Sequence, residues 1–144
     1  MHDLGQPGDV LPVLLHDELE PPPYISAAEW ERCSPWIEGA LRHSHGTHEL
    51  TDVLEDIAAN RATLWIWERS ALVTQISRFP RLTVCTFWLA GGDMRELMSK
   101  EPGVCAWAKR NGCNRIALHG RKGWTRVFER IGYATGHHSV FKEL

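Results

Sequence analysis

The stretch that decides the fold runs from residue 109 to residue 133 and reads KRNGCNRIALHGRKGWTRVFERIGY. Its second half has apolar residues at the i, i+3, i+4 and i+7 positions of a helix, namely Trp124, Val127, Phe128 and Ile131. Its first half has a short apolar run at 116–118, the pattern of a strand covered on both faces. A helix end, a strand and a second helix predict a crossover onto a sheet, and so an α/β domain of the layered α+β kind.

The composition is that of one ordinary globular domain. A chain of 144 residues can bury a sizeable core, and its net charge of −2 gives no general attraction to nucleic acid or to anionic membranes. We find no nucleic-acid-binding motif, no run of roughly 18–20 apolar residues and no secretory signal. The sequence therefore predicts an intracellular protein with reduced cysteines and no membrane partner, and it leaves nucleic acid as a less favoured partner than protein. Three histidines, at 43, 45 and 48, lack a completing ligand pattern, so we expect no metal.

Residues 1 to about 24 predict an extended arm, because Pro7, Pro12 and the prolines at 21–23 prevent a long helix. The arm also contains an apolar cluster, so part of it should pack against another surface. Seven tryptophans are many for a core of this size, and Trp is enriched at interfaces. Trp65 and Trp67 fit the core as well as an interface. The predicted partner-binding residues are Val10, Leu11, Leu14, Trp65 and Trp67.

Three helices are predicted at the start of the single domain that spans residues 25–144. A capping box at Ser26 opens the first, Pro35 in a first turn opens the second, and Thr47 caps the third. The expected ranges are 27–33, 34–43 and 48–60.

Three strands are predicted next, and the third is apolar on both faces and therefore central. Asp93 caps the crossover helix that follows, and Pro102 with Gly103 breaks or kinks it. A strand, a helix and a final strand complete the chain. The expected strands are 63–68, 71–79, 82–89, 115–119 and about 139–144, and the last helix is 122–131.

This order of elements resembles the GNAT superfamily of acyl-CoA N-acyltransferases. The family's helix-to-strand segment, A-x-x-x-G-C/A-x-x-I, is matched by residues 108–116, and its Φ-Y-x-x-x-G-F/Y segment corresponds to residues 127–133. More narrowly, the chain resembles the short GNAT-like proteins that tailed bacteriophages encode among their virion genes. The resemblance covers roughly residues 47–144 and implies a mixed sheet with an antiparallel meander, a central crossover helix and a C-terminal strand–helix–strand.

In the GNAT family, a Q/R-x-x-G-x-G/A loop binds the acyl-CoA pyrophosphate on backbone N–H groups at a helix N-terminus. The corresponding residues here, 88–93, read WLAGGD, with Trp88 in place of Gln or Arg and Asp93 in place of the closing small residue. A carboxylate there would occupy the same amides and repel a pyrophosphate. The resemblance implies that any acyl-CoA would be bound by Ala90, Gly91, Gly92, Asp93, Arg95, Arg121 and Lys122.

The family's proton donor is the Tyr of Φ-Y-x-x-x-G-F, and the residue at that position here is Phe128, which has no proton to give. Tyr133 corresponds to a structural aromatic position and should point elsewhere. Glu68 and His119 each end a strand and are the two candidates for a general base. We therefore predict no firm catalytic residue, and no cofactor unless acetyl-CoA is bound.

Three functions stay open. The first is a bacteriophage structural or adaptor protein, found in the virion and, during assembly, in the host cytoplasm. It would be present in several copies beside portal, adaptor, tail or fibre proteins. The second is an acetyl-CoA-dependent N-acetyltransferase, and the third is an inhibitor that binds a host protein. The altered loop, Phe128, the tryptophans and the arm favour the first.

Overall fold

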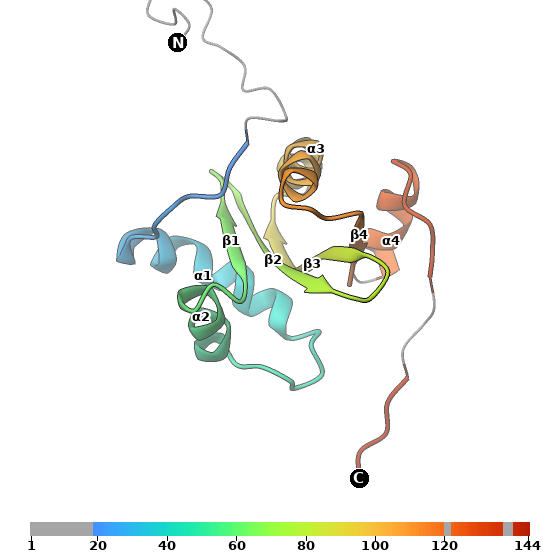
Figure 1. Ribbon diagram of the computed structural model, residues 1–144. Helices are drawn as coiled ribbons and strands as arrows, with labels where there is room; N and C mark the ends of the chain where they lie inside the picture. The colour runs from blue at the N-terminus through green and yellow to red at the C-terminus, as the bar shows by residue number, and fades with distance from the viewer. Residues whose placement is uncertain (1–18, 120–121, 137–139) are drawn as a thin grey trace, which may run out of the picture.

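The computed structural model describes residues 19–119, 122–136 and 140–144, and it shows a mixed sheet with helices on both faces (Figure 1). The strand order is β1-β2-β3-β4. The first three strands form an antiparallel meander, and β4 pairs in parallel with β3. The strands are β1 (Thr63–Ile66), β2 (Ser70–Arg78), β3 (Thr83–Gly92) and β4 (Arg115–Leu118). This is the predicted layered α/β class.

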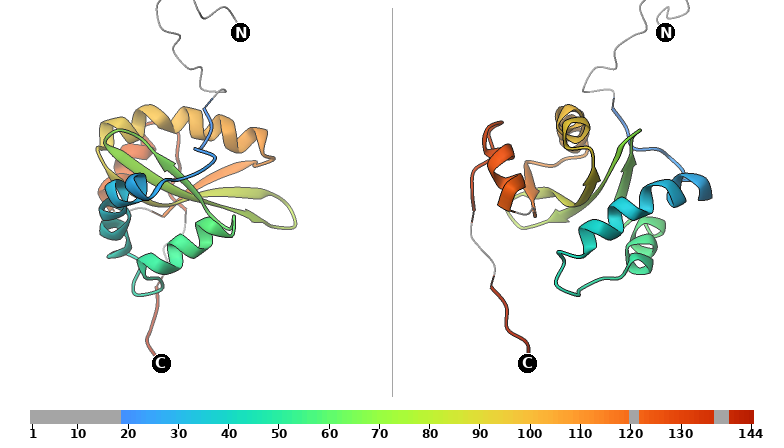
Figure 2. Two further views of the ribbon diagram at one scale, coloured as in Figure 1. Left: turned by 90° about the vertical axis from the view of Figure 1, so that its left-hand side faces the viewer. Right: turned by 180° about the vertical axis from the view of Figure 1, so that it is seen from behind.

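Alternating side chains of the sheet build two cores, as the period of two along a strand requires. Trp65, Leu72 and Phe87 point to the face covered by α3 (Met94–Arg110) and α4 (Lys122–Glu129). Leu64, Val73 and Leu89 point to the face covered by α1 (Ala27–Leu41) and α2 (Leu50–Ala58). Figure 2 shows the two helical layers on opposite sides of the sheet. None of the described helices is long and apolar enough to cross a bilayer.

The predicted break between the first two helices is wrong, because α1 is continuous through Pro35. Cys33, Ile37 and Leu41 are buried at four-residue intervals on either side of this proline, so one apolar stripe packs along the sheet. A proline inside a helix costs about 3 kcal/mol, and burying an aliphatic side chain contributes about 1.5–3 kcal/mol. Burial of the stripe therefore outweighs the lost hydrogen bond. Helix α3 is continuous through Pro102 for the same reason.

Two further boundaries differ from the prediction. The N-cap of α2 is Glu49 rather than Thr47, and the Glu49 N–H donates to the Asp52 carboxylate at 2.8 Å. The final strand is also wrong over residues 140–144, which form no strand. Val140 and Phe141 are largely exposed there, so no burial favours their pairing with the sheet.

The end of the predicted arm lies against α3. Leu19 packs on Gly103, and Arg110 donates both to the Leu19 carbonyl and to the Glu20 carboxylate. Residues 19–24 contain neither helix nor strand. The predicted partner-binding residues of the arm, Val10, Leu11 and Leu14, lie outside the described residues.

We expect substitution of Gly91 to separate α1 from the sheet. A Cβ at Gly91 would lie 2.5 Å from the Trp36 carbonyl oxygen, so Gly91→Ala should lower the free energy of unfolding by about 1–3 kcal/mol. Gly39→Ala is the control, because no atom lies within 4 Å of its added Cβ and alanine favours a helix by up to about 1 kcal/mol. Urea unfolding measures both. Equal effects of the two substitutions would contradict this account of the packing.

Candidate functional site

The segment expected to bind a phosphate is not a loop. Strand β3 does not end at residue 89 but continues through Gly92, with Gly91 opposite Ala71 and Gly92 opposite Ser70. Gly92 has a φ of +100°, and a Cβ there would overlap the backbone of Arg69. Both glycines are therefore explained by close approach, one to α1 and the other to the β1–β2 turn.

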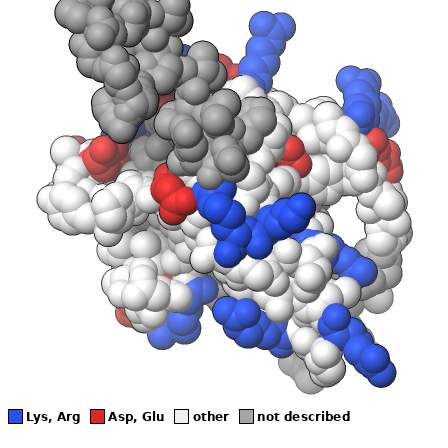
Figure 3. All heavy atoms as spheres, turned by 45° about the horizontal axis from the view of Figure 1, so that its top comes forward, with Lys and Arg blue, Asp and Glu red and all other residues white. Residues whose placement is uncertain are grey.

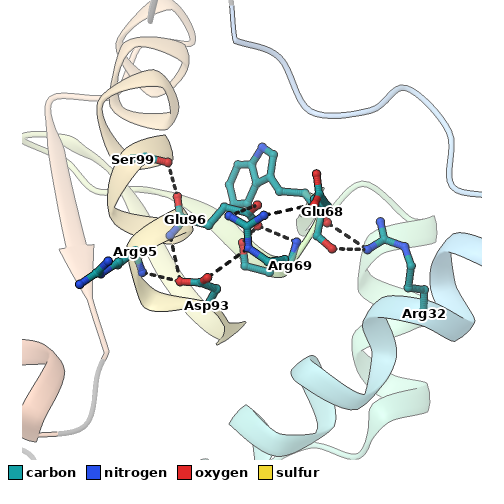
Figure 4. Close-up of polar contacts among 9 residues, drawn as sticks. Arg32, Glu68, Arg69, Asp93, Arg95, Glu96 and Ser99 are labelled. Atoms are coloured by element: carbon teal, nitrogen blue, oxygen red, sulfur yellow. Dashed lines mark hydrogen bonds and ion pairs between the residues drawn. The ribbon is translucent and has the colours of Figure 1, made fainter.

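Asp93 is the N-cap of α3, as predicted. Its Oδ1 accepts hydrogen bonds from the backbone N–H groups of Arg95 at 2.8 Å and Glu96 at 3.3 Å. Its Oδ2 accepts from Nε of Arg69 at 3.1 Å (Figure 4). The bond from Arg69 lowers the pKa of Asp93 below its ordinary value, and the Glu96 amide lowers it further. The amides that an external phosphate would use are thus bonded to the protein's own carboxylate.

Glu96 fixes the β1–β2 turn to the same helix end. Its carboxylate is buried, and its Oε1 accepts from the Arg69 N–H at 2.8 Å and from the Ser70 hydroxyl at 2.5 Å. Its Oε2 lies 3.5 Å from Nη2 of Arg69. A buried carboxylate needs several such partners to offset its desolvation. Sequence reasoning missed Arg69 and Glu96, because their contact joins residues far apart in the chain.

The two predicted general bases do not share a site. Glu68 lies in the β1–β2 turn with 82% of its side chain exposed, and it is ion-paired with Arg69 at 3.2 Å. His119 is exposed and follows β4, where its N–H donates to the Phe87 carbonyl. Glu68 follows β1 and His119 follows β4, and these are the two edge strands of the sheet, about 14 Å apart by strand spacing. Arg95 is exposed, whereas Arg121 and the side chain of Lys122 lie outside the described residues.

Phe128, at the position of the family's proton donor, is a core residue. It is 3% exposed and packs edge-to-face on Tyr133, with ring centroids 5.0 Å apart. It lines a cavity of about 10 Å³ between α3, α4 and the sheet, together with Trp67, Leu97 and Trp124. This volume holds at most one water molecule. The space between these helices and the sheet is therefore filled by side chains.

A polar cluster that sequence reasoning missed joins α3 to the segment after α4. The Tyr133 hydroxyl donates to Oε2 of Glu101 at 2.5 Å, and the Cys105 thiol donates to the same oxygen at 3.2 Å. Burial, followed by the contact with Glu101, raises the pKa of Tyr133 above its ordinary value and raises the pKa of Cys105 to about 12. Both groups therefore hold their protons at neutral pH. The one sequence signal was that Glu101 and Cys105 share a helix face at i and i+4.

The tryptophans belong mainly to the core. Trp65 is fully buried, and its Nε1 donates to the Thr74 hydroxyl at 3.2 Å. Trp67 is partly buried and packs against the apolar core that contains Trp65. Of the two interpretations of Trp65, the structure agrees with a core residue. No three His, Cys, Asp or Glu side chains among the described residues form a group that could hold a metal ion.

Comparison with known proteins identifies the fold. No protein-family model and no curated protein matches the chain. Solved structures do match: a Bacillus halodurans transcriptional regulator has a TM-score of 0.59 at 14% identity, with 83% of this chain and 96% of that chain covered. A probable acetyltransferase has a TM-score of 0.58 at 9% identity, covering 83% and 93%. A Trypanosoma brucei acetyltransferase has a TM-score of 0.52 at 13% identity, covering 67% and 78%.

The chain has the GNAT fold. At these identities the likeness concerns the fold alone, which confirms the fold that the resemblance implied. None of the three named structures is described as a bacteriophage protein, so a bacteriophage origin stays a hypothesis.

Removing the Tyr133 hydroxyl should weaken the attachment of the C-terminal segment to α3. Tyr133→Phe leaves Glu101 with one partner fewer, and we expect about 1–2 kcal/mol lower stability at neutral pH. Because the folded pKa of Tyr133 is raised, its contribution is complete below about pH 10 and is lost as the pH rises further.

Urea unfolding between about pH 9 and 11 tests this pH dependence. The wild type should lose up to about 1.4 kcal/mol per pH unit more than Tyr133→Phe above pH 10. The exposed Tyr24 provides the control, since Tyr24→Phe should retain the wild-type slope. Parallel curves for the wild type and Tyr133→Phe would exclude the proposed linkage.

Proposed function

We propose that this chain uses the GNAT fold as a binding protein and does not act as an acyl-CoA-dependent enzyme. The observation that carries the proposal is the Asp93 carboxylate, which accepts two backbone N–H groups at the start of α3 and is paired with Arg69. A pyrophosphate at this helix end would have to displace a carboxylate from both amides and from its counter-ion. The negative charges would otherwise repel each other.

The surrounding backbone supports the same conclusion. Gly91 and Gly92 pair with β2, so a phosphate-binding loop would require opening the end of the sheet. The cavity between α3, α4 and the sheet has a volume of about 10 Å³, and Phe128 offers no proton there. The residues present therefore do not fit an acyl-CoA at the family's position.

As a finer proposal, the binding role is that of a structural or adaptor component in a multi-copy assembly, such as a virion. Its support is the resemblance to short phage proteins together with the arm, whose last residues are tied to α3 by Arg110. The second candidate is an acetyl-CoA-dependent N-acetyltransferase. It is favoured by fold neighbours that are described as acetyltransferases.

Calorimetric titration with acetyl-CoA and with CoA distinguishes the two candidates. We expect no heat of binding from the wild type at millimolar ligand, because the amides of Arg95 and Glu96 are already bonded. A Kd in the micromolar range for the wild type would overturn the proposal and favour the acetyltransferase.

Asp93→Ser tests whether the carboxylate itself is responsible, because serine still caps a helix but carries no charge. Weak CoA binding by Asp93→Ser, with none by the wild type, would support the proposal directly. Asn60→Ser is a matched control outside the site, and it should leave the calorimetric result unchanged.

A further inference from the structure

Acidic and basic residues are divided along this chain. Residues 1–68 contain thirteen Asp and Glu but only three Arg and no Lys. Residues 69–92 contain three Arg, residues 102–128 contain six Lys and Arg, and neither segment contains Asp or Glu. The net charge of −2 is therefore the small difference between two large opposite charges that belong to different parts of the fold.

Several of the basic residues belong to segments that lie at the end of the sheet where β2 turns into β3. The turn is closed by the Phe79 N–H, which donates to the Leu82 carbonyl at 2.9 Å. Arg78 lies opposite Thr83, and Arg115 of β4 lies opposite the next residue of β3, Val84. Asn114, which follows the end of α3, bonds Thr83 through both its backbone and its side chain. We call this end of the sheet the basic tip: Arg78, Phe79, Arg81, Lys109 and Arg115.

The cations of the basic tip are exposed and have no carboxylate partner in the part of the chain that the structure describes. Arg78, Arg81, Lys109 and Arg115 form no ion pair with an acidic side chain of the described residues, whereas Arg110 is paired with Glu20. In the view of Figure 3, Lys and Arg side chains predominate over the lower half of the face, whereas most of the visible Asp and Glu side chains lie in its upper half. Phe79, between two of these arginines, is 57% exposed. Neither packing nor ion pairing inside the chain accounts for these residues.

The basic tip also projects from the sheet. Strand β1 pairs with β2 only as far as Thr74, and β4 pairs with β3 only from Val84 onward. The hairpin therefore extends beyond β1 from residue 75 onward, and its turn at 79–82 also lies beyond β4; in the left view of Figure 2 it reaches the edge of the molecule. The turn exposes an aromatic ring, Phe79, beside two arginines, and such a ring can stack on an unpaired base.

We propose that the basic tip binds nucleic acid through its phosphates. Arginine binds phosphate oxygens in a bidentate way, and a polyanion is bound tightly by few contacts because counter-ions are released. A specific protein partner would need about 800 Å² of surface, which a convex turn with one apolar side chain does not offer. This proposal holds whether or not the chain binds acyl-CoA, because Asp93 lies at the other end of β3, about 30 Å from the basic tip.

Fluorescence anisotropy with a labelled 20-nucleotide strand and a 20-base-pair duplex of unrelated sequence tests the proposal. For four phosphate contacts we expect the logarithm of the affinity to fall with the logarithm of salt concentration at a slope of about −3 to −4. Arg78→Ala/Arg81→Ala should reduce the slope to about −2 and weaken binding roughly tenfold or more near physiological salt. The control Arg42→Ala/Lys142→Ala removes two exposed charges elsewhere and should bind like the wild type.

Two results would overturn the proposal. One is equal binding by the two double variants, with circular dichroism confirming that both are folded. The other is salt-sensitive self-association of the wild type in sedimentation, lost in Arg78→Ala/Arg81→Ala, without binding of either nucleic acid. That outcome would mean that the basic tip binds the acidic α1–α2 layer of a second copy of the chain.

Discussion

The contacts of Arg69 with Asp93 and Glu96 fix how the sheet and α3 meet. The backbone N–H of Arg69 donates to Glu96, and its guanidinium contacts both carboxylates. Because Glu96 is buried, the loss of these donors would leave a charge without compensation in the core. The β1–β2 turn and the start of α3 are thus held in one arrangement. Arg32 extends the contact to α1 through the carbonyls of Trp67 and Glu68.

This arrangement sets stability and anion binding in opposition. A helix N-terminus has unpaired N–H groups that either a capping side chain or an external anion can use. In this chain Asp93 uses them, and its own charge is balanced by Arg69. Each contact that strengthens the cap makes the same amides less available to a phosphate. The feature that anchors α3 is therefore the feature that argues against an acyl-CoA at this position.

Local signals in the sequence predicted most of the fold. Short apolar segments, alternating in the first strand and apolar on both faces in the third, located the meander. The Asp93 cap was predictable because it acts on amides two and three residues away. The continuous helix through Pro35 was not predictable in this way, since its stability depends on burial of Ile37 against the sheet. The contacts Arg69–Asp93 and Tyr133–Glu101 join residues 24 and 32 positions apart, which no local pattern connects.

The position of unpaired charges, like these long-range contacts, could not be predicted from local sequence patterns. A net charge is a sum over the chain, and electrostatic attraction depends on which charges remain unpaired and where they gather. At one end of β3, Arg69 and the helix amides are neutralised by Asp93 and Glu96. At the other end, the four cations of the basic tip have no acidic partner among the described residues. An approaching polyanion is therefore attracted to the end of the sheet opposite the one that the GNAT fold uses for a phosphate.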